Sequence, residues 1–373
     1  MATVHIICGR YYNTEKNEHT VGGIQTYISA LRPIIKSLGM DCVIYQNEEK
    51  DYETVLSDVK IISVNAEKSE KDIKKVEKSL KKCMETFDDN QDILLFSTDT
   101  RILPNKASRS IAIQHGIYWD MPTHEDFSPL MSDLYVFSKV RLTYRTISNL
   151  RKVKRVVCVD HNFPNWLRAS CAYQAVKLDV IPNFTEIAEE NKKADDRINI
   201  IFARRFEKYR GTRIFADAVK KILSEYDNVY VTLAGTGPDE KYLKDALNDF
   251  KNRVEFITYK SGDSLKVHAD KHIAVVPTVG SEGTSLSLLE AMSAQCAVIC
   301  TDVGGMSNIV LDGYNGVISD RNSESLYHCM KDLIDNEQKR ITLSQRAYET
   351  VKEAFSYEVW SRKWKKVFED MLK

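Results

Sequence analysis

Short apolar runs rich in β-branched residues alternate with amphipathic stretches along the chain, and this series occurs twice. In the first series the apolar runs cover 3–8, 41–46, 59–65, 92–98, 109–116 and 155–160, with helical spacing over 23–38 and 71–84. In the second they cover 198–203, 229–235, 254–259, 272–278 and 297–302, with helical spacing over 212–223, 240–250 and 286–294. Strands that alternate with helices build parallel sheets through right-handed crossovers. The pattern predicts an α/β protein with two Rossmann-like, doubly wound parallel-sheet domains.

A polar stretch of mixed charge, 184–196, separates the two series and is typical of a linker. It predicts a first domain over 1–183 and a second over 184–355. The remaining segment, 356–373, is amphipathic, with Trp360, Trp364, Val367 and Phe368 at helical spacing. One interpretation is a basic helix on a membrane surface. We favour a helix that packs back on the body of the protein, on the first domain.

The composition excludes several classes of protein. Lysine and arginine number 53, as do aspartate and glutamate, so the formal charge is zero and a nucleic-acid binder is disfavoured. The eight cysteines form no Cys-x-x-Cys pair, which indicates reduced thiols. The first residues are too short an apolar run for a signal peptide, and no run approaches the ~20 apolar residues of a membrane span. We expect a cytoplasmic protein.

A glycine-containing loop follows the apolar run that ends near residue 278. Gly280 and Gly283 allow close approach of a ligand, and Thr284, Ser285 and the first amides of the next helix offer donors to an anion. Glu282 and Glu290 flank the start of this helix with seven residues between them. Carboxylates accept hydrogen bonds from sugar hydroxyls, so the loop suits a ligand with phosphate and hydroxyl groups. The alternative is a capping box, in which Ser287 and Glu290 only cap the N-terminus of the helix and bind no ligand.

Residues 280–318 resemble the signature of glycosyltransferase family four, retaining enzymes with the GT-B architecture of two Rossmann-like domains facing each other across a cleft. The matching positions are Glu282, Gly283, Glu290, Ala291, Met292, Val298, Gly304, Gly305, Asp312, Gly313 and Gly316. The segments 21–27, 180–184, 200–211 and 231–243 are similar to further family motifs. Gln295 and Ala297 depart from the pattern, where the family has Gly and Pro, and Arg204 stands where Gly is common.

The resemblance implies transfer of a sugar from a nucleotide-diphosphate donor in the second domain. By this reading Arg205 and Arg210 bind the diphosphate and offset the charge of the leaving group. Glu282 would hold hydroxyls of the donor sugar and Glu290 those of the ribose. The nucleobase would lie near Thr258 and Tyr259, and the amides of Gly283, Thr284 and Ser285 would complete the donor contacts.

The resemblance also implies a role for the first domain. Gly22 and Gly23 would form a loop that approaches the phosphate, and His115 would contact the donor sugar as a fourth catalytic residue beside Glu282, Arg205 and Arg210. The acceptor-side candidates are Asp99, Asp120, His124 and His161. No metal site and no cofactor are expected, because the two basic residues replace a divalent ion. His268 and His272 have helical ligand spacing, yet a solvated pair is the favoured interpretation.

Seven basic residues and no acidic one fall between Lys139 and Arg155, interleaved with apolar side chains. Such a run is usually a solvated face. Because basic residues near anionic lipid each contribute about 1 kcal/mol, we expect this stretch to contact the inner face of a membrane or a lipid-pyrophosphate-linked acceptor.

The function expected from the sequence is a retaining, metal-independent glycosyltransferase acting on a glycan or lipid-linked glycan in cell-envelope polysaccharide synthesis. Two alternatives stay open. One is a nucleotide-sugar epimerase of the same twin-Rossmann plan, and the other is a catalytically silent scaffold for another glycosyltransferase.

Overall fold

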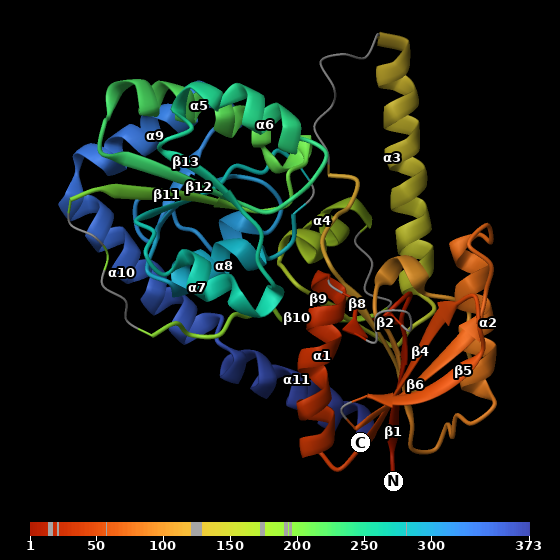
Figure 1. Ribbon diagram of the computed structural model, residues 1–373. Coiled ribbons are helices and arrows are strands. Elements are labelled where there is room, and N and C mark those ends of the chain that lie inside the picture. Colours follow the sequence, from red (N-terminus) through yellow and green to blue (C-terminus); the bar gives the residue numbers. More distant parts are fainter. Residues whose placement is uncertain are drawn as a thin grey trace. The chain divides into compact units, whose positions relative to one another are not determined.

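The computed structural model describes residues 1–13, 18–20, 22–56, 58–120, 129–171, 176–189, 193, 196–280 and 282–373. The chain forms two compact units (Figure 1). The first unit comprises Met1–His115, Glu125–Ile181 and Trp360–Lys373, and the second comprises Gly116–His124 and Pro182–Val359. The chain therefore divides after Ile181 rather than after 183, a short segment from 116 onward groups with the second unit, and the residues from Trp360 return to the first.

An eight-stranded sheet in the order β10-β9-β8-β7-β1-β4-β6-β5 forms the centre of the first unit. Its strands are β1 (Thr3–Ile7), β4 (Asp41–Glu48), β5 (Tyr52–Leu56), β6 (Val59–Asn65), β7 (Ile93–Phe96), β8 (Ser110–Gln114), β9 (Arg155–Cys158) and β10 (Lys177–Val180). Only the edge pair β5 and β6 is antiparallel among these. All four residues of β7 are buried, as expected of a parallel strand covered on both faces.

Five α-helices accompany this sheet in the described part of the first unit. They are α1 (Gly23–Ser37), α2 (Asp72–Met84), α3 (Pro129–Leu150), α4 (Asn162–Cys171) and the C-terminal α11 (Tyr357–Leu372), with a short 3-10 turn η1 (Asp99–Arg101) after β7 and a small ladder of β2 (Tyr12–Asn13) and β3 (Glu18–His19). The buried face of α1 repeats the helical spacing seen in the sequence.

The C-terminal helix α11 completes the core of the first unit. Its side chains Trp360, Trp364, Val367 and Phe368 are each at most 2% exposed. The indole Nε1 of Trp364 donates a hydrogen bond to the Tyr27 hydroxyl of α1 at 2.8 Å, and the Tyr27 and Trp360 rings meet edge to face with centroids 5.1 Å apart. The aromatic face of this helix is therefore buried and is not available to a membrane.

Arg155 belongs to the same interior rather than to an exposed basic stretch. Its side chain is 4% exposed, and its Nε donates to Asp179 Oδ2 at 2.5 Å while Nη1 lies 3.6 Å from Asp370 of α11. The expected basic stretch over 139–155 therefore does not include Arg155, which is buried. A buried arginine keeps its charge only where carboxylates pair with it.

A six-stranded parallel sheet in the order β13-β12-β11-β14-β15-β16 forms the second unit. Its strands are β11 (Ile198–Ala203), β12 (Val229–Ala234), β13 (Val254–Ile257), β14 (Ile273–Val276), β15 (Ala297–Thr301) and β16 (Val317–Ser319). The helices are α5 (Thr212–Glu225), α6 (Glu240–Ala246), α7 (Ser264–His268), α8 (Leu286–Ser293), α9 (Ser323–Asp335) and α10 (Glu337–Ala354), with the 3-10 turns η2 (Lys208–Arg210), η3 (Asn248–Phe250), η4 (Ser261–Asp263) and η5 (Met306–Asn308).

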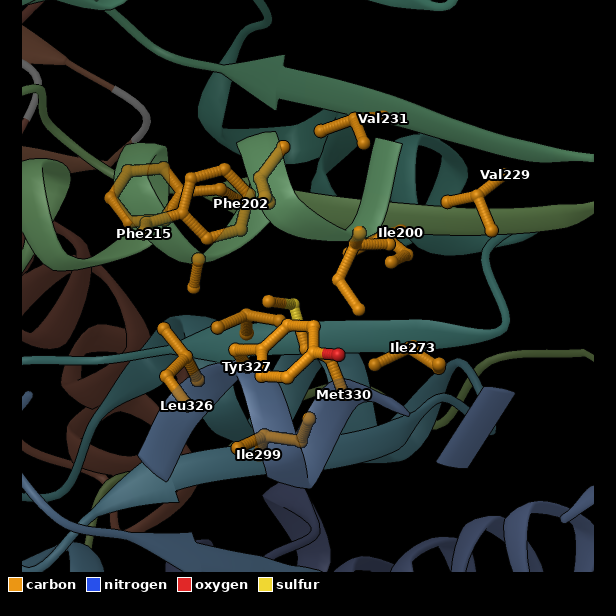
Figure 2. Packing of buried hydrophobic residues seen from close by; sticks show 14 of the residues in the cluster. Ile200, Phe202, Phe215, Val229, Val231, Ile273, Ile299, Leu326, Tyr327 and Met330 are labelled. Carbon is orange, nitrogen blue, oxygen red and sulfur yellow. The ribbon is translucent and has the colours of Figure 1, made fainter. Parts of the chain in front are cut away.

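Two hydrophobic cores cover the two faces of this sheet. On one face Ile200 and Phe202 of β11 pack with Phe215 of α5 and with Leu326 and Met330 of α9 (Figure 2). On the other face the alternate β11 residues pack with α8 and α10. Side chains of successive strand residues point to opposite faces, so one strand serves both cores. The second unit is doubly wound, as the sequence predicts.

The expected linker is ordered where the structure describes it. Thr185 N donates to Phe355 O at 3.0 Å, and Ala188 N donates to Ser293 Oγ at 2.9 Å. Both Thr185 and Ala188 are buried. The polar composition of 184–196 signals a domain border, but the backbone amides of Thr185 and Ala188 bind its first residues to the rest of the second unit.

Replacing Trp364 with alanine should lower the free energy of unfolding by about 3–5 kcal/mol, because it leaves a cavity in the first unit and removes a hydrogen bond to the Tyr27 hydroxyl. Urea denaturation followed by circular dichroism measures the change. Lys366→Ala, on the exposed face of the same helix, is the matched control. A loss for Trp364→Ala no larger than that of the control would show that α11 does not stabilise this unit.

Candidate functional site

The order of strands in the second unit reverses between β11 and β14. From β11 the chain proceeds outward to β12 and β13, and from β14 it proceeds the other way to β15 and β16. Loops that leave the carboxyl ends of two such strands diverge, and the crevice between them is where open α/β sheets bind ligands. Here the two loops are 204–211, after β11, and 277–285, after β14.

A buried charge cluster joins these two loops. Glu282 accepts hydrogen bonds through Oε2 from Arg204 and from Arg210, and the Thr278 hydroxyl lies 3.3 Å from the same oxygen. Burial alone would raise the pKa of Glu282, but the two guanidinium groups outweigh it and lower the pKa. Glu282 is therefore a carboxylate at neutral pH. These contacts all converge on Oε2.

The structure places the two adjacent arginines after β11 differently. Arg204 is 6% exposed and also donates to Thr278, whereas Arg205 is 75% exposed and pairs with Glu207 at 3.1 Å. Of the two neighbours, Arg204 therefore belongs to the cluster and Arg205 lies outside it. The role of Arg205 at the diphosphate stays a prediction, and Arg204, which departs from the family pattern, is the residue that contacts Glu282.

Two motif glycines make room for the charged loops. Gly304 has φ +56°, and a Cβ there would lie 1.8 Å from the carbonyl oxygen of Glu282. Gly235 has φ +151°, and a Cβ there would lie 2.0 Å from the carbonyl oxygen of Arg204. Each glycine lets a neighbouring turn pack directly on the backbone of a cluster residue, which fixes the position of its side chain.

Helix α8 begins one residue after the predicted anion loop. Ser285 is its N-cap, without a side-chain capping bond, so Ser287 and Glu290 do not form the capping box that was the structural alternative. Thr284 and Ser285 are buried and Gly283 is half-buried. Asn183, which no motif indicated as a site residue, donates to Thr284 O at 2.7 Å and fixes this loop.

The second glutamate lies in a separate small network. Ser264 Oγ donates to Glu290 Oε2 at 2.5 Å. Burial raises the pKa of Glu290 to about 7, against the opposing effect of this hydrogen bond. Burial, and then the charge of Glu290, raises the pKa of Tyr259 to about 12. The structure thus brings together Glu290 and Tyr259, with exposed Thr258 beside them, and adds Ser264, which the sequence did not indicate.

In the first unit, His115 follows β8 and Asp99 follows β7. Burial lowers the pKa of His115 to about 4, against the effect of its hydrogen bond to Ser97 O at 2.9 Å. The ring is neutral, and since a carbonyl only accepts, Nε2 carries the proton. Burial raises the pKa of Asp99 to about 7. Gly22 is the N-cap of α1 and Gly23 its first residue.

The remaining acceptor-side candidates are scattered. Asp120 is half-buried and groups with the second unit, and His161 is exposed before α4. His124 lies outside the described residues. Two polar side chains that the sequence did not indicate are fully buried at the ends of β8 and β9. Both amide atoms of Gln114 and Oδ2 of Asp160 have no hydrogen-bond partner in the described part of the chain.

Comparison with known proteins identifies the second unit. Residues 183–350 match the model of the family described as glycosyl transferases group 1. These residues are a group 1 glycosyltransferase domain. An uncharacterised glycosyltransferase of Methanocaldococcus jannaschii is 23% identical over 72% of this chain and 69% of its own length, and a second is 28% identical over 58% and 60%. The predicted resemblance to family-four glycosyltransferases is confirmed.

Solved structures show the fold of the whole chain. A sucrose-phosphate synthase from Thermosynechococcus elongatus superposes with a TM-score of 0.76 at 14% identity, covering 100% of this chain and 99% of its own. TarM superposes with a TM-score of 0.74 at 13% identity, covering 99% of each chain. At such identities the likeness shows the fold alone, and that fold is GT-B, as predicted.

The histidine pair of the group 1 domain has a structural role. His268 is 1% exposed, with Nδ1 2.8 Å from Ser264 O, and burial lowers its pKa to about 4. His272 Nδ1 accepts from Asn199 N at 3.0 Å. The expectation of a solvated pair is wrong for His268, because α7 turns it into the core. Among the described residues, no group of three potential ligands is placed to hold a metal ion.

Replacing Glu290 with glutamine should remove a pH dependence of stability. Between pH 4.5, the ordinary pKa of the carboxyl group, and about 7, its pKa in the fold, the unfolded chain has lost a proton that the folded chain still holds. Relative to the variant, the free energy of unfolding of the unsubstituted chain should fall as the pH rises through this range and then level off.

Thermal midpoints of the two chains, measured from about pH 4 to about pH 9, give this difference, in which the other titrating groups cancel. The exposed Glu349→Gln is the matched control. A difference that stays constant over the range would place the pKa of Glu290 outside it.

Proposed function

We propose that the protein is a retaining glycosyltransferase that moves a sugar from a nucleotide-diphosphate donor to a glycan or lipid-linked glycan. The observation that carries the proposal is the cluster of Glu282 with Arg204 and Arg210 where the strand order of the group 1 domain reverses. One carboxylate between two guanidinium groups leaves a net positive charge in a largely desolvated crevice. Such a site favours a dianionic group.

The donor is held by groups with different chemistry. Arg210 is 21% exposed, and its guanidinium group contacts Glu282 and lies 4.7 Å from the centre of the Tyr209 ring. In the proposed complex its exposed N–H groups donate to the diphosphate. The first amides of α8 have no partner within the helix and add positive potential beside it. Oε1 of Glu282 accepts from a hydroxyl of the donor sugar. Glu290 accepts from the ribose, with the base near Thr258 and Tyr259.

The reaction then needs one bond exchanged and one proton moved. The bond from the anomeric carbon to the diphosphate oxygen breaks as a bond to the acceptor oxygen forms on the same face. The acceptor proton passes to the departing diphosphate. Arg204 and Arg210 offset the charge that grows on this leaving group, where fixed cations are worth the most. We propose that they take the place of a divalent metal ion and that no cofactor is used.

Relatives support the choice of substrates. HepE of Anabaena and the pneumococcal transferase GtfA have been solved with UDP, which favours a UDP-sugar donor here. A phosphatidyl-myo-inositol mannosyltransferase of Mycolicibacterium smegmatis and a lipopolysaccharide 1,2-N-acetylglucosaminetransferase of Salmonella typhimurium are 23% and 26% identical over about half of this chain. Their names favour a role in building an envelope glycan.

Replacing Arg204 with alanine should lower kcat about 100-fold or more, whereas Arg205→Ala should change it by less than about threefold, because only Arg204 lies in the cluster. Release of nucleotide from UDP-, GDP- and ADP-sugars, with and without a glycan acceptor and EDTA, measures the rates. Proton NMR of the product gives its anomeric configuration.

Arg210→Ala, at a partly exposed position, gives the same test with less effect on folding. Loss of activity in Arg205→Ala but not in Arg204→Ala would contradict the assigned site. Interconversion of sugars without an acceptor would indicate the epimerase, and absence of turnover with every donor would indicate the scaffold. An inverted product, or activity that EDTA abolishes, would contradict the mechanism.

Helix α3 of the first unit presents an amphipathic face to solvent. Phe137, Val140 and Tyr144 are 76%, 60% and 75% exposed. With the exposed Arg141 and Arg145 they follow the i, i+3, i+4, i+7, i+8 spacing of one face. No helix in the described ranges has the length and apolar character that would let it cross a bilayer. We propose that this face places the protein on the cytoplasmic surface of an anionic membrane, within reach of a lipid-linked acceptor.

Arg141→Gln with Arg145→Gln should weaken binding to vesicles that contain phosphatidylglycerol by about 2 kcal/mol, because each basic residue near anionic lipid contributes about 1 kcal/mol. Co-sedimentation with phosphatidylcholine vesicles, with and without phosphatidylglycerol, measures binding. Lys74→Gln with Lys81→Gln, two exposed lysines of α2, is the matched control. Equal loss in both double variants would show that binding does not depend on α3.

A further inference from the structure

The sheet of the first unit also has a point where its strand order reverses. β1 lies between β4, which starts the series toward β6, and β7, which starts the series toward β8, β9 and β10. The loops that leave β1 and β7 begin at Cys8 and Ser97, and the η1 turn Asp99–Arg101 belongs to the second of them. By the same rule that places the cluster of the second unit, a ligand is expected between these loops.

Arg101 occupies this point. A Cβ on Gly9 would lie 2.4 Å from both terminal nitrogens of Arg101, so the guanidinium group rests directly on the bare backbone after β1. The side chain is half-buried. Among the described residues no acceptor forms a hydrogen bond or ion pair with its guanidinium group. A partly desolvated guanidinium group without a partner is costly unless a ligand supplies the acceptor.

A cavity of about 480 Å³ opens beside Arg101 and Gly9, between α2 and the ends of β4 and β6. Five basic and three acidic residues line it. Two of the basic residues form ion pairs with acidic residues of the lining. Arg10 lies 3.0 Å from Glu48, and Lys68 lies 3.4 Å from Glu49. The excess of positive charge therefore comes from Arg101 and from the lysines of the lining. Lys75 is one of these, and its Nζ donates to Lys68 O at 3.1 Å.

We propose that this cavity binds an anionic group, a phosphate or a carboxylate, on the acceptor substrate, and that Arg101 is its principal contact. The assignment to the acceptor rests on the proposed function, in which the donor is bound by Arg204, Arg210, Glu282 and Glu290. All four of these residues lie in the second unit. We therefore assign the binding of the acceptor to the first unit. A volume of about 480 Å³ admits more than one small ion and suits a sugar carrying the anionic group.

Replacing Arg101 with glutamine should weaken the binding of methyl phosphate and of glucuronate about tenfold or more, as expected for a charge-assisted hydrogen bond. Glucose binding should not change. Isothermal titration calorimetry on the full chain, saturated with UDP so that the donor site is filled, measures these affinities. Lys81→Gln removes the same charge from an exposed position on α2 outside the cavity and should leave them unchanged.

Gly9→Ala provides an independent variant. The three atoms nearest its Cβ all belong to the end of the flexible Arg101 side chain, so it should displace the guanidinium group more readily than the backbone. It should weaken binding of the anions as Arg101→Gln does. Equal affinities of the unsubstituted chain, Arg101→Gln and Gly9→Ala for the anions, or equal losses in Lys81→Gln, would overturn the proposal.

Phosphatidylcholine vesicles that carry a polyprenyl phosphate distinguish a lipid-borne anion from a soluble one. Binding of these vesicles that depends on Arg101, together with weak binding of methyl phosphate, would assign the anion to a lipid-linked acceptor. Hydrolysis of the nucleotide-sugar donor should be the same in Arg101→Gln and the unsubstituted chain, and a parallel loss would overturn the assignment to the acceptor. A chain that hydrolyses no donor but binds anions through Arg101 would contradict the proposed function and leave this site intact.

Discussion

The direction of parallel strands is the constraint on which both units depend. All carboxyl ends of a parallel ladder meet at one edge, and where the order of strands reverses, the loops on the two sides diverge and leave a crevice. Each unit places an arginine there, Arg204 in the second and Arg101 in the first. In the second unit the arginine is paired with Glu282, and in the first it faces a cavity. The two sheets thus place an arginine at the same topological position, but within the described residues only the arginine of the second unit is paired with a carboxylate there.

Burial sets the charge state of the groups around these edges. Glu282 keeps its charge only because two guanidinium groups compensate for desolvation, whereas Glu290, bonded to a neutral hydroxyl, has its pKa raised to about 7. Burial likewise lowers the pKa of His115, which is neutral, and raises the pKa of Asp99. Two glutamates of one motif therefore differ in chemistry because their neighbours differ, not because their sequence context does.

Much of this fold could be predicted from hydrophobic spacing. The expected helix over 212–223 is α5, Thr212–Glu225, and the expected strand over 198–203 is β11. The spacing also indicated the loop after β14 and both glutamates. It indicated no element over 323–354, where α9 and α10 form. Gln295 adopts φ +57°, a backbone conformation that favours glycine, at the position where the family pattern has glycine.

The amino-acid sequence by itself determined the two α/β domains and the loops that carry the charged residues, because these depend on local periodicity and on turn residues. Only the tertiary structure decided which of two adjacent arginines meets Glu282, that His268 and Arg155 are buried, and that the Arg101 guanidinium group lies over Gly9. Those outcomes depend on which way a side chain leaves its strand or helix and on what the neighbouring strand brings to it. A linear pattern records neither of these.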